Sequence, residues 1–104
     1  MQFIIIAKDG TDADALNRRL AAREAHMAHL TQAAQTGEQL IAAAMINDKD
    51  QMCGSVLIVD FENRETLDNW LKTEAYVTGN VWQDIEVISC KLPPPFQHLI
   101  SKKP

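Results

Sequence analysis

Residues 55–61 read Ser-Val-Leu-Ile-Val-Asp-Phe, and this stretch decides the fold. Its β-branched and aromatic residues favour a strand, and apolar side chains fall on both of its alternating faces. Residues 1–7 have the same character and end at a turn signal, Lys8-Asp9-Gly10. Because a strand that is apolar on both faces is covered on both faces, the sequence predicts two buried strands.

A helix is predicted between these strands, from residue 12 to about residue 36. Apolar residues recur there at the spacing of one helix face, and they are Leu16, Leu20, Met27, Leu30 and Ala34. Thr11 or Asp12 is expected to cap the start of this helix, and Gly37 to end it. Arg23 occupies a position in the stripe where an apolar residue is expected.

A second helix is predicted after the strand at 55–61. Asn63 is expected to cap it, and Glu65 lies in its first turn, where the helix dipole favours an anion. Leu67, Trp70 and Leu71 would form its apolar face.

Two further strands complete the set. Residues 40–46 form a strand candidate that three alanines weaken. Residues 81–92 form the last strand, and Pro93-Pro94-Pro95 ends it and is expected to continue as polyproline II. The predicted domain therefore covers residues 1–92 and is followed by a proline-rich C-terminal tail at 93–104.

The resulting order is β-α-β-β-α-β, which is the order of the ferredoxin-like fold, an α+β class with an antiparallel sheet. Two helices cover only one face of a four-stranded sheet. Since the strands are apolar on both faces, the second face needs another cover, and the simplest cover is a second copy of the chain. The pattern therefore predicts a homodimer.

Composition excludes several classes of partner. The chain has 104 residues, of which 14 are acidic and 10 basic, for a formal net charge of −4. This sign removes the main driving force for binding nucleic acid or an anionic membrane. The N-terminal apolar run is too short for a signal peptide or a membrane span. Cys53 and Cys90 have no motif spacing, so we expect two unpaired thiols in a cytoplasmic protein.

Two histidines stand out on the first predicted helix. His26 lies beside Met27 and four residues before Leu30, at the border of the predicted apolar stripe. His29 follows at i+3, but no third ligand has suitable spacing, so we expect no metal site. Either histidine taken alone is more typical of a boundary side chain bonded to a backbone carbonyl.

Glu74 falls on the apolar face of the second predicted helix, four residues after Trp70. A buried carboxylate is costly unless it is paired, protonated or beside a cavity, and the alternative is a helix-end glutamate that bends out to water. Tyr76 and Trp82 flank the segment at 77–80. This aromatic pair suits a ligand-pocket wall or the edge of the core, and the sequence does not decide between the two.

The chain resembles the YciI-like (YCII-related) family over residues 1–92. The most specific parts are an Arg23-x-x-His26 segment and a Glu74-x-Tyr76-Val77 segment. Asp9-Gly10, Gly54-Ser55-Val56, the helix around Trp70 and the closing strand also match. The chain departs from the family pattern in two places. It has Glu74-Ala75-Tyr76 where the family has Asp-Pro-Tyr, and it has Glu24 where the family has a proline.

This resemblance implies a ferredoxin-like domain that forms a dimeric α+β barrel. It also implies a histidine–carboxylate pair, which here falls on His26 and Glu74. We expect Glu74 to orient His26, and His26 to act as general acid or base. Arg23 would hold an anionic oxygen of the substrate, and Ser55 and Tyr76 would supply hydrogen bonds.

Two functional hypotheses follow. The first is a small enzyme that uses no cofactor and eliminates, isomerises or hydrolyses a small anionic or aromatic substrate. The alternative is a non-catalytic dimer that binds a metabolite without turning it over.

Overall fold

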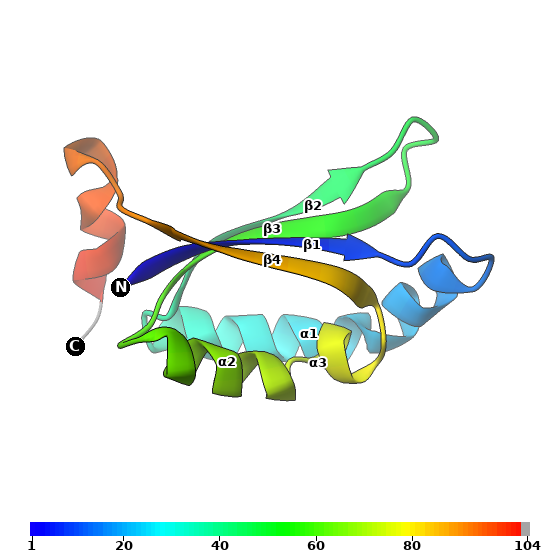
Figure 1. The fold of residues 1–104 in the computed structure, drawn as a ribbon, viewed down its shortest axis with the longest axis horizontal. Coiled ribbons are helices and arrows are strands. Elements are labelled where there is room, and N and C mark those ends of the chain that lie inside the picture. Colours follow the sequence, from blue (N-terminus) through cyan, green and yellow to red (C-terminus); the bar gives the residue numbers. More distant parts are fainter. Residues whose placement is uncertain (103–104) are drawn as a thin grey trace.

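The computed structural model describes residues 1–102 and shows two layers, a four-stranded sheet and a layer of helices (Figure 1). The strands are β1 (Gln2–Asp9), β2 (Gln39–Ile46), β3 (Met52–Asp60) and β4 (Trp82–Cys90). The helices are α1 (Ala15–Gln35), α2 (Arg64–Thr73) and α3 (Ala75–Thr78). The strand order is β2-β3-β1-β4, and all neighbouring strands are antiparallel. The predicted ferredoxin-like α+β fold is confirmed.

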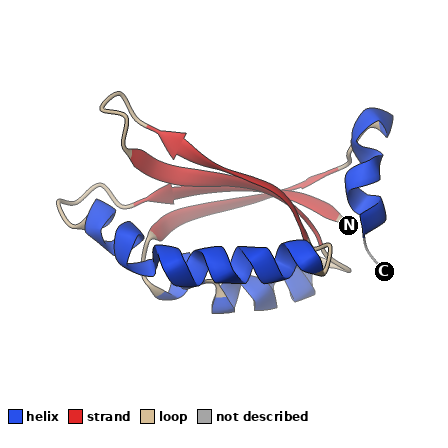
Figure 2. Ribbon diagram, turned by 180° about the vertical axis from the view of Figure 1, so that it is seen from behind, coloured by secondary structure: helices blue, strands red, loops and turns tan. Residues whose placement is uncertain are grey.

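The core lies between the sheet and the helices, which all cover the same face (Figure 2). Alternation along the central strands explains this arrangement. Phe3 and Ile5 on β1 point to the helices, and so do Leu57 and Val59 on β3; all four are at most 1% exposed. The β2–β3 hairpin rises away from α1 (Figures 1 and 2), and residues of α1, β2 and β3 line the cavity that holds the candidate site.

The other face of the sheet carries a row of isoleucines. Cross-strand pairing places one on each strand, and the row reads Ile41, Ile58, Ile4 and Ile88. Ile41 and Ile88, at the two edges, are 55% and 39% exposed. No helix of the described residues covers this face (Figures 1 and 2).

Helix α1 buries a face that only partly overlaps the one that the apolar spacing predicted, since Leu30 packs against the core but Leu20 and Met27 do not. Its buried residues are Ala15, Arg19, His26 and Ala33. Leu20 and Met27, two members of the predicted stripe, are 53% and 41% exposed. The prediction was partly wrong because hydrophobicity alone does not set this face. Small alanines pack at its ends, and two polar side chains find buried partners in its middle.

The predicted caps are partly confirmed. Asn63 accepts a hydrogen bond from the Thr66 backbone N–H at 2.9 Å, and the Thr66 hydroxyl lies 3.2 Å from the Asn63 N–H, which completes a capping box. Gly37 follows α1 with a φ of 86°, a conformation that favours glycine. The start of α1 differs, because the helix begins at Ala15 and the side chain of Asp12 binds Arg18 instead.

The C-terminal segment also differs from the expectation. Pro94–Lys102 forms a 3-10 helix (η1) at the end of the sheet, not polyproline II (Figure 1). Proline fixes φ near −65°, which suits both conformations, so the proline run alone does not distinguish them. The last two residues of the expected tail, 103–104, lie outside the described residues.

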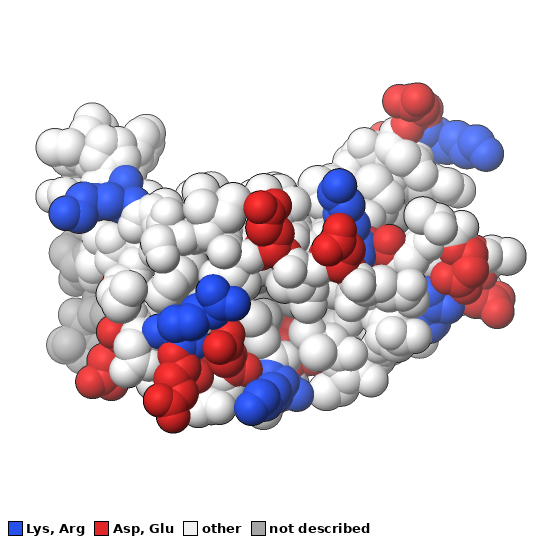
Figure 3. Space-filling model, in the orientation of Figure 1, with Lys and Arg blue, Asp and Glu red and all other residues white. Residues whose placement is uncertain are grey.

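Acidic and basic side chains are mixed on the face of the molecule that Figure 3 shows, and they are not separated by sign. Among the helices within residues 1–102, none is long and apolar enough to cross a membrane.

The close packing of β3 between β1 and β2 leads to a stability prediction. A Cβ at Gly54 would lie 2.6 Å from the Ala7 carbonyl oxygen and would also meet the Met45 methyl group. Because the carbonyl belongs to the sheet backbone, we expect Gly54→Ala to destabilise the fold by about 1–3 kcal/mol in urea unfolding.

The matched control is Gly10→Ala. A Cβ at Gly10 would meet only the flexible ends of Arg18 and Gln83, so we expect a change within about 0.5 kcal/mol. Equal effects of the two substitutions would contradict the packing argument.

Candidate active site

Glu74 lies at the junction of two helices and is completely buried. Helix α2 ends at Thr73, and the extended backbone of Glu74 (φ −67°, ψ 130°) turns the chain into α3. Its carboxylate caps α3 by accepting a hydrogen bond from the Tyr76 N–H at 3.1 Å. The sequence placed Glu74 on α2 itself and left open a carboxylate in water; the structure corrects both points.

Two histidines of α1 converge on this carboxylate. Nδ1 of His26 contacts Oε1 of Glu74, and Nδ1 of His29 contacts Oε2. Residues three apart lie on one side of a helix, so a single buried carboxylate reaches both rings. The sequence paired Glu74 with His26 only and considered His29 as a metal ligand. Within residues 1–102, no group of three potential ligands is arranged to hold a metal ion.

The pKa of Glu74 reflects two opposing effects. Burial favours the neutral acid and acts to raise the pKa, whereas the hydrogen bonds from His26 and His29 favour the carboxylate. The hydrogen bonds prevail, so the pKa of Glu74 lies below its usual value of 4.5. The carboxylate is therefore an ionised acceptor at neutral pH.

Aromatic side chains hold the His26 ring in place. Tyr76 stacks on it with ring centres 3.7 Å apart and planes 10° from parallel, and Trp82 approaches edge-on at 5.6 Å. Both aromatic residues are buried, and Tyr76 also contributes to the cavity wall. Burial raises the pKa of the Tyr76 hydroxyl. Tyr76 therefore satisfies both hypotheses that the sequence left open, since it belongs to the core and to the pocket.

Arg19 forms a second buried polar group that the sequence analysis missed. Its guanidinium binds both carboxylate oxygens of Asp9 at 3.0 Å and donates to Ser55 Oγ at 3.1 Å. It also lies over the Tyr76 ring, 4.8 Å from the centroid. The available signal was position: Arg19 precedes His26 by seven residues, which is two helical turns, so both lie on one face.

Ser55 connects these groups. Besides the bond from Arg19, its Oγ accepts a hydrogen bond from Trp82 Nε1 at 3.1 Å. Its own hydroxyl proton remains available for donation. The structure thus brings Ser55, Tyr76 and His26 to the wall of one cavity.

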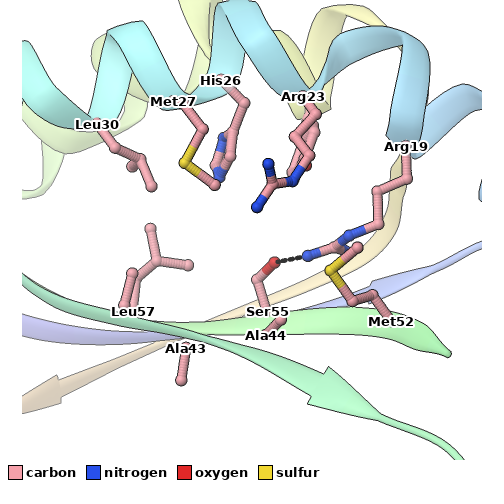
Figure 4. A pocket seen from close by; sticks show the side chains of 12 residues that line it. Arg19, Arg23, His26, Met27, Leu30, Ala43, Ala44, Met52, Ser55 and Leu57 are labelled. Carbon is pink, nitrogen blue, oxygen red and sulfur yellow. Dashed lines mark hydrogen bonds between the residues drawn. The ribbon is translucent and has the colours of Figure 1, made fainter. Parts of the chain in front are cut away.

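A cavity of about 240 Å³ lies between α1 and the β2–β3 hairpin. Its polar lining residues are Arg19, Arg23, His26, Ser55 and Tyr76. Its apolar lining includes Met27, Leu30 and Leu57, while alanines of β2 contribute short side chains. Figure 4 shows Arg19, Arg23 and His26 reaching from α1 toward this space, opposite Ser55 and Leu57.

The two arginines differ in their charge environment. Arg19 is neutralised by Asp9, whereas Arg23 has no ion-pair partner in the described part of the chain. Glu74 lies behind His26, outside the cavity lining. The cavity therefore offers an anion one uncompensated guanidinium beside an imidazole, an arrangement suited to binding an acidic oxygen and moving a proton next to it.

Comparison with known proteins identifies relatives over nearly the whole chain. The profile described as YCII-related domain matches residues 1–91. Protein YciI of Escherichia coli is 32% identical over 93 residues, which span 84% of this chain and 93% of that protein. An uncharacterized protein of Haemophilus influenzae is 33% identical over 94 residues, with the same coverage of 84% and 93%.

Solved structures share the fold at lower identity. The 5-chloro-2-hydroxyhydroquinone dehydrochlorinase (TftG) of Burkholderia phenoliruptrix, in complex with 2,5-dihydroxybenzoquinone, superposes with a TM-score of 0.76. It is 20% identical, and the match covers 89% of this chain and 96% of that chain. A putative antibiotic biosynthesis monooxygenase from Nitrosomonas europaea gives a TM-score of 0.52 at 19% identity, covering 89% and 90%.

The Glu74 cluster leads to a pH prediction. Because the folded-state pKa of this carboxyl is depressed, its stabilising contribution is present above about pH 4.5 and is lost as the pH falls through the folded pKa. Glu74→Gln breaks the buried pairing, so we expect it to destabilise the protein by about 3–5 kcal/mol at about pH 6. Urea unfolding of both proteins at several pH values should show this difference shrinking below about pH 4.5.

The control is Glu24→Gln, which removes an exposed carboxylate from α1. It should stay within about 0.5 kcal/mol of the wild type. If the stability difference between wild type and Glu74→Gln stays constant down to about pH 3, the charged pairing is contradicted. A carboxyl group whose pKa is lowered by folding must lose its stabilising contribution when it is protonated.

Proposed function

The chain belongs to the YCII-related domain family, and we propose that it is a small enzyme that works without a cofactor. In this proposal His26 is the general acid or base, acting on a small anionic or aromatic substrate in the cavity between α1 and the sheet. One observation carries the proposal. Nδ1 of His26 is held by the buried Glu74, while Nε2 makes no hydrogen bond within residues 1–102 and the ring lines the cavity.

This arrangement meets the requirements of acid–base catalysis. A histidine that moves protons needs one nitrogen fixed, so that the other is aimed at the substrate. Glu74 and the stacked Tyr76 fix the ring. When His26 takes up a proton during the reaction, the carboxylate behind it stabilises the imidazolium. Arg23 would then stabilise negative charge that develops on the substrate.

Cavity size and lining define the proposed substrate class. A volume of about 240 Å³ is below the range of drug-sized ligands, roughly 300–1,000 Å³, and favours a molecule of one ring or a short chain. Leu30, Leu57 and Met27 provide apolar contact, and Arg23 provides the charge for an anionic oxygen. A hydroxylated aromatic ring or a small carboxylate has both properties.

A second candidate is the non-catalytic, metabolite-binding dimer. Its supporting observation is the low exposure of the His26 side chain, 5%, which limits direct contact with a ligand in this conformation. The two candidates differ in one measurable respect, because only the enzyme converts a bound compound.

A further part of the proposal is a homodimer built through the isoleucine row of the open sheet face. Four isoleucines in register present a continuous apolar row that a second copy can cover about a twofold axis. We also place the protein in the cytoplasm, since Cys53 and Cys90 are free thiols.

The catalytic proposal is tested with two probes taken from the similar dehydrochlorinase fold. Titration calorimetry with 2,5-dihydroxybenzoquinone measures binding, and chloride release from 5-chloro-2-hydroxyhydroquinone, followed by a panel of hydroxylated aromatics, measures turnover. We expect His26→Asn to lower kcat by about 10²–10⁴-fold while the ligand still binds, because it removes the acid–base group and little of the charge.

Arg23→Gln is the complementary variant. Losing its charged hydrogen bond, worth about 1.5–3 kcal/mol, should weaken binding by roughly 10–150-fold. His98→Asn, on the exposed C-terminal helix, should change neither quantity. Undiminished turnover by His26→Asn would refute the catalytic role, and binding without any turnover across the panel would favour the metabolite-binding alternative.

The dimer is tested by solution mass. Light scattering should give twice the 11.6 kDa of one chain. Ile41→Glu combined with Ile88→Glu should give the monomer mass, because it places charges in the apolar interface while both sites are already exposed in the single chain. Leu20→Glu, which is equally exposed on α1, should remain a dimer. A monomeric wild-type protein would end the proposal.

A further inference from the structure

Glu74 contacts two histidines that line different cavities. His26 lies in the wall of the cavity described above. His29 lies in the wall of a second cavity of about 240 Å³, and the lining of that cavity is His29, Gln32, Ala33, Thr36, Glu38 and Trp70. His29 stacks on Trp70 with ring centres 4.7 Å apart, and its side chain is 20% exposed. One carboxylate therefore links an inner imidazole to an outer one.

The hydrogen-bond partners of His29 are compatible with a ring that donates from both nitrogens. The Thr73 hydroxyl donates its single proton to the Trp70 carbonyl oxygen at 2.8 Å. The same Oγ1 lies 3.3 Å from His29 Nε2, so there the hydroxyl oxygen acts as acceptor and Nε2 carries a hydrogen. On the other side of the ring, Nδ1 faces the ionised Glu74 carboxylate and must also donate. A ring that donates from both nitrogens is the imidazolium.

The hydrogen bonds of His26 differ. Nδ1 donates to Glu74, but Nε2 makes no bond to any described residue. One carboxylate supplies a single negative charge, and the imidazolium of His29 already neutralises it. A second imidazolium at His26 would share the cavity wall with the uncompensated guanidinium of Arg23 and be repelled by it.

We propose that His29 is a positioning residue that carries the positive charge paired with Glu74, so that His26 rests as a neutral base. The Nε2 lone pair of His26 then faces the cavity. The role of this charge distribution in catalysis rests on the proposed function. The reaction would begin when Nε2 of His26 removes a proton from the substrate. The negative charge left on the substrate would then lie beside Arg23. The proton remains on Nε2 until it is returned to the product.

The surrounding charges support this distribution. His29 faces Glu74 from the α2–α3 junction and Glu38, which shares the lining of the outer cavity. His26 contacts the same Glu74 and shares the wall of the inner cavity with Arg23, which has no ion-pair partner among the described residues. The outer ring therefore has two carboxylates near it, whereas the inner ring has one carboxylate and one uncompensated guanidinium.

Nitrogen NMR of the imidazole rings tests the assignment without any substrate. In the full-length protein at about pH 7, the spectrum should show His29 with two protonated nitrogens, and His26 with a protonated Nδ1 and an unprotonated Nε2. The reverse pattern, two imidazolium rings or two neutral rings would each overturn the proposal. His98→Gln assigns the third histidine and should leave the other two patterns unchanged.

His29→Gln provides the second measurement. With the outer charge removed, the carboxylate is free to pair with the inner ring, so His26 should become doubly protonated at about pH 7. A merely structural role of His29 would leave the His26 pattern unchanged, and that result would overturn the proposal. The NMR measurements test where the charge lies, and the turnover of wild type and His26→Asn tests whether His26 is catalytic. Either proposal can therefore fail while the other holds.

Discussion

A single buried negative charge organises this protein. Glu74 has no exposed surface, and a carboxylate in that position is destabilising unless every direction around it offers a hydrogen-bond donor. Three donors meet it: the Tyr76 N–H and one ring nitrogen from each of two histidines on α1. The two histidine contacts join residues 48 and 45 positions apart, and they fix how α1 lies against the α2–α3 junction. The orientation of His26 toward the cavity follows from this packing.

The sequence predicted the fold well because strand patterns depend on local composition. The order of elements, the Asn63 cap and the glycine end of α1 all followed from short-range chemistry. The buried face of α1 did not, because its decisive members are polar and their partners lie far away in the sequence. Arg19 is buried by Asp9 and Ser55, which no spacing rule connects to it. Hydrophobic periodicity cannot identify a helix face that is held by ion pairs.

In the candidate site too, features set by nearby sequence were predicted and features set by distant contacts were not. His26 and Glu74 were identifiable as polar side chains at apolar positions, and the family resemblance paired them. His29 was not assigned to this pair, because its contact with Glu74 depends on the chain turning at Glu74 between α2 and α3. The position of that turn is a tertiary property, since the residues around it are also compatible with a longer α2. The C-terminal 3-10 helix was missed for a similar reason: proline restricts the backbone without choosing one conformation.

The short side chains on the β2 side of the cavity affect how the shape of the cavity can change. Ala42 and Ala44 on the edge strand β2 line the space opposite α1, and their side chains end at Cβ. A larger residue at either position would extend into the cavity and leave the core unchanged, because both alanines are exposed and lie outside the core cluster. The shape of the site can therefore be altered independently of the Glu74 cluster that keeps the protein folded.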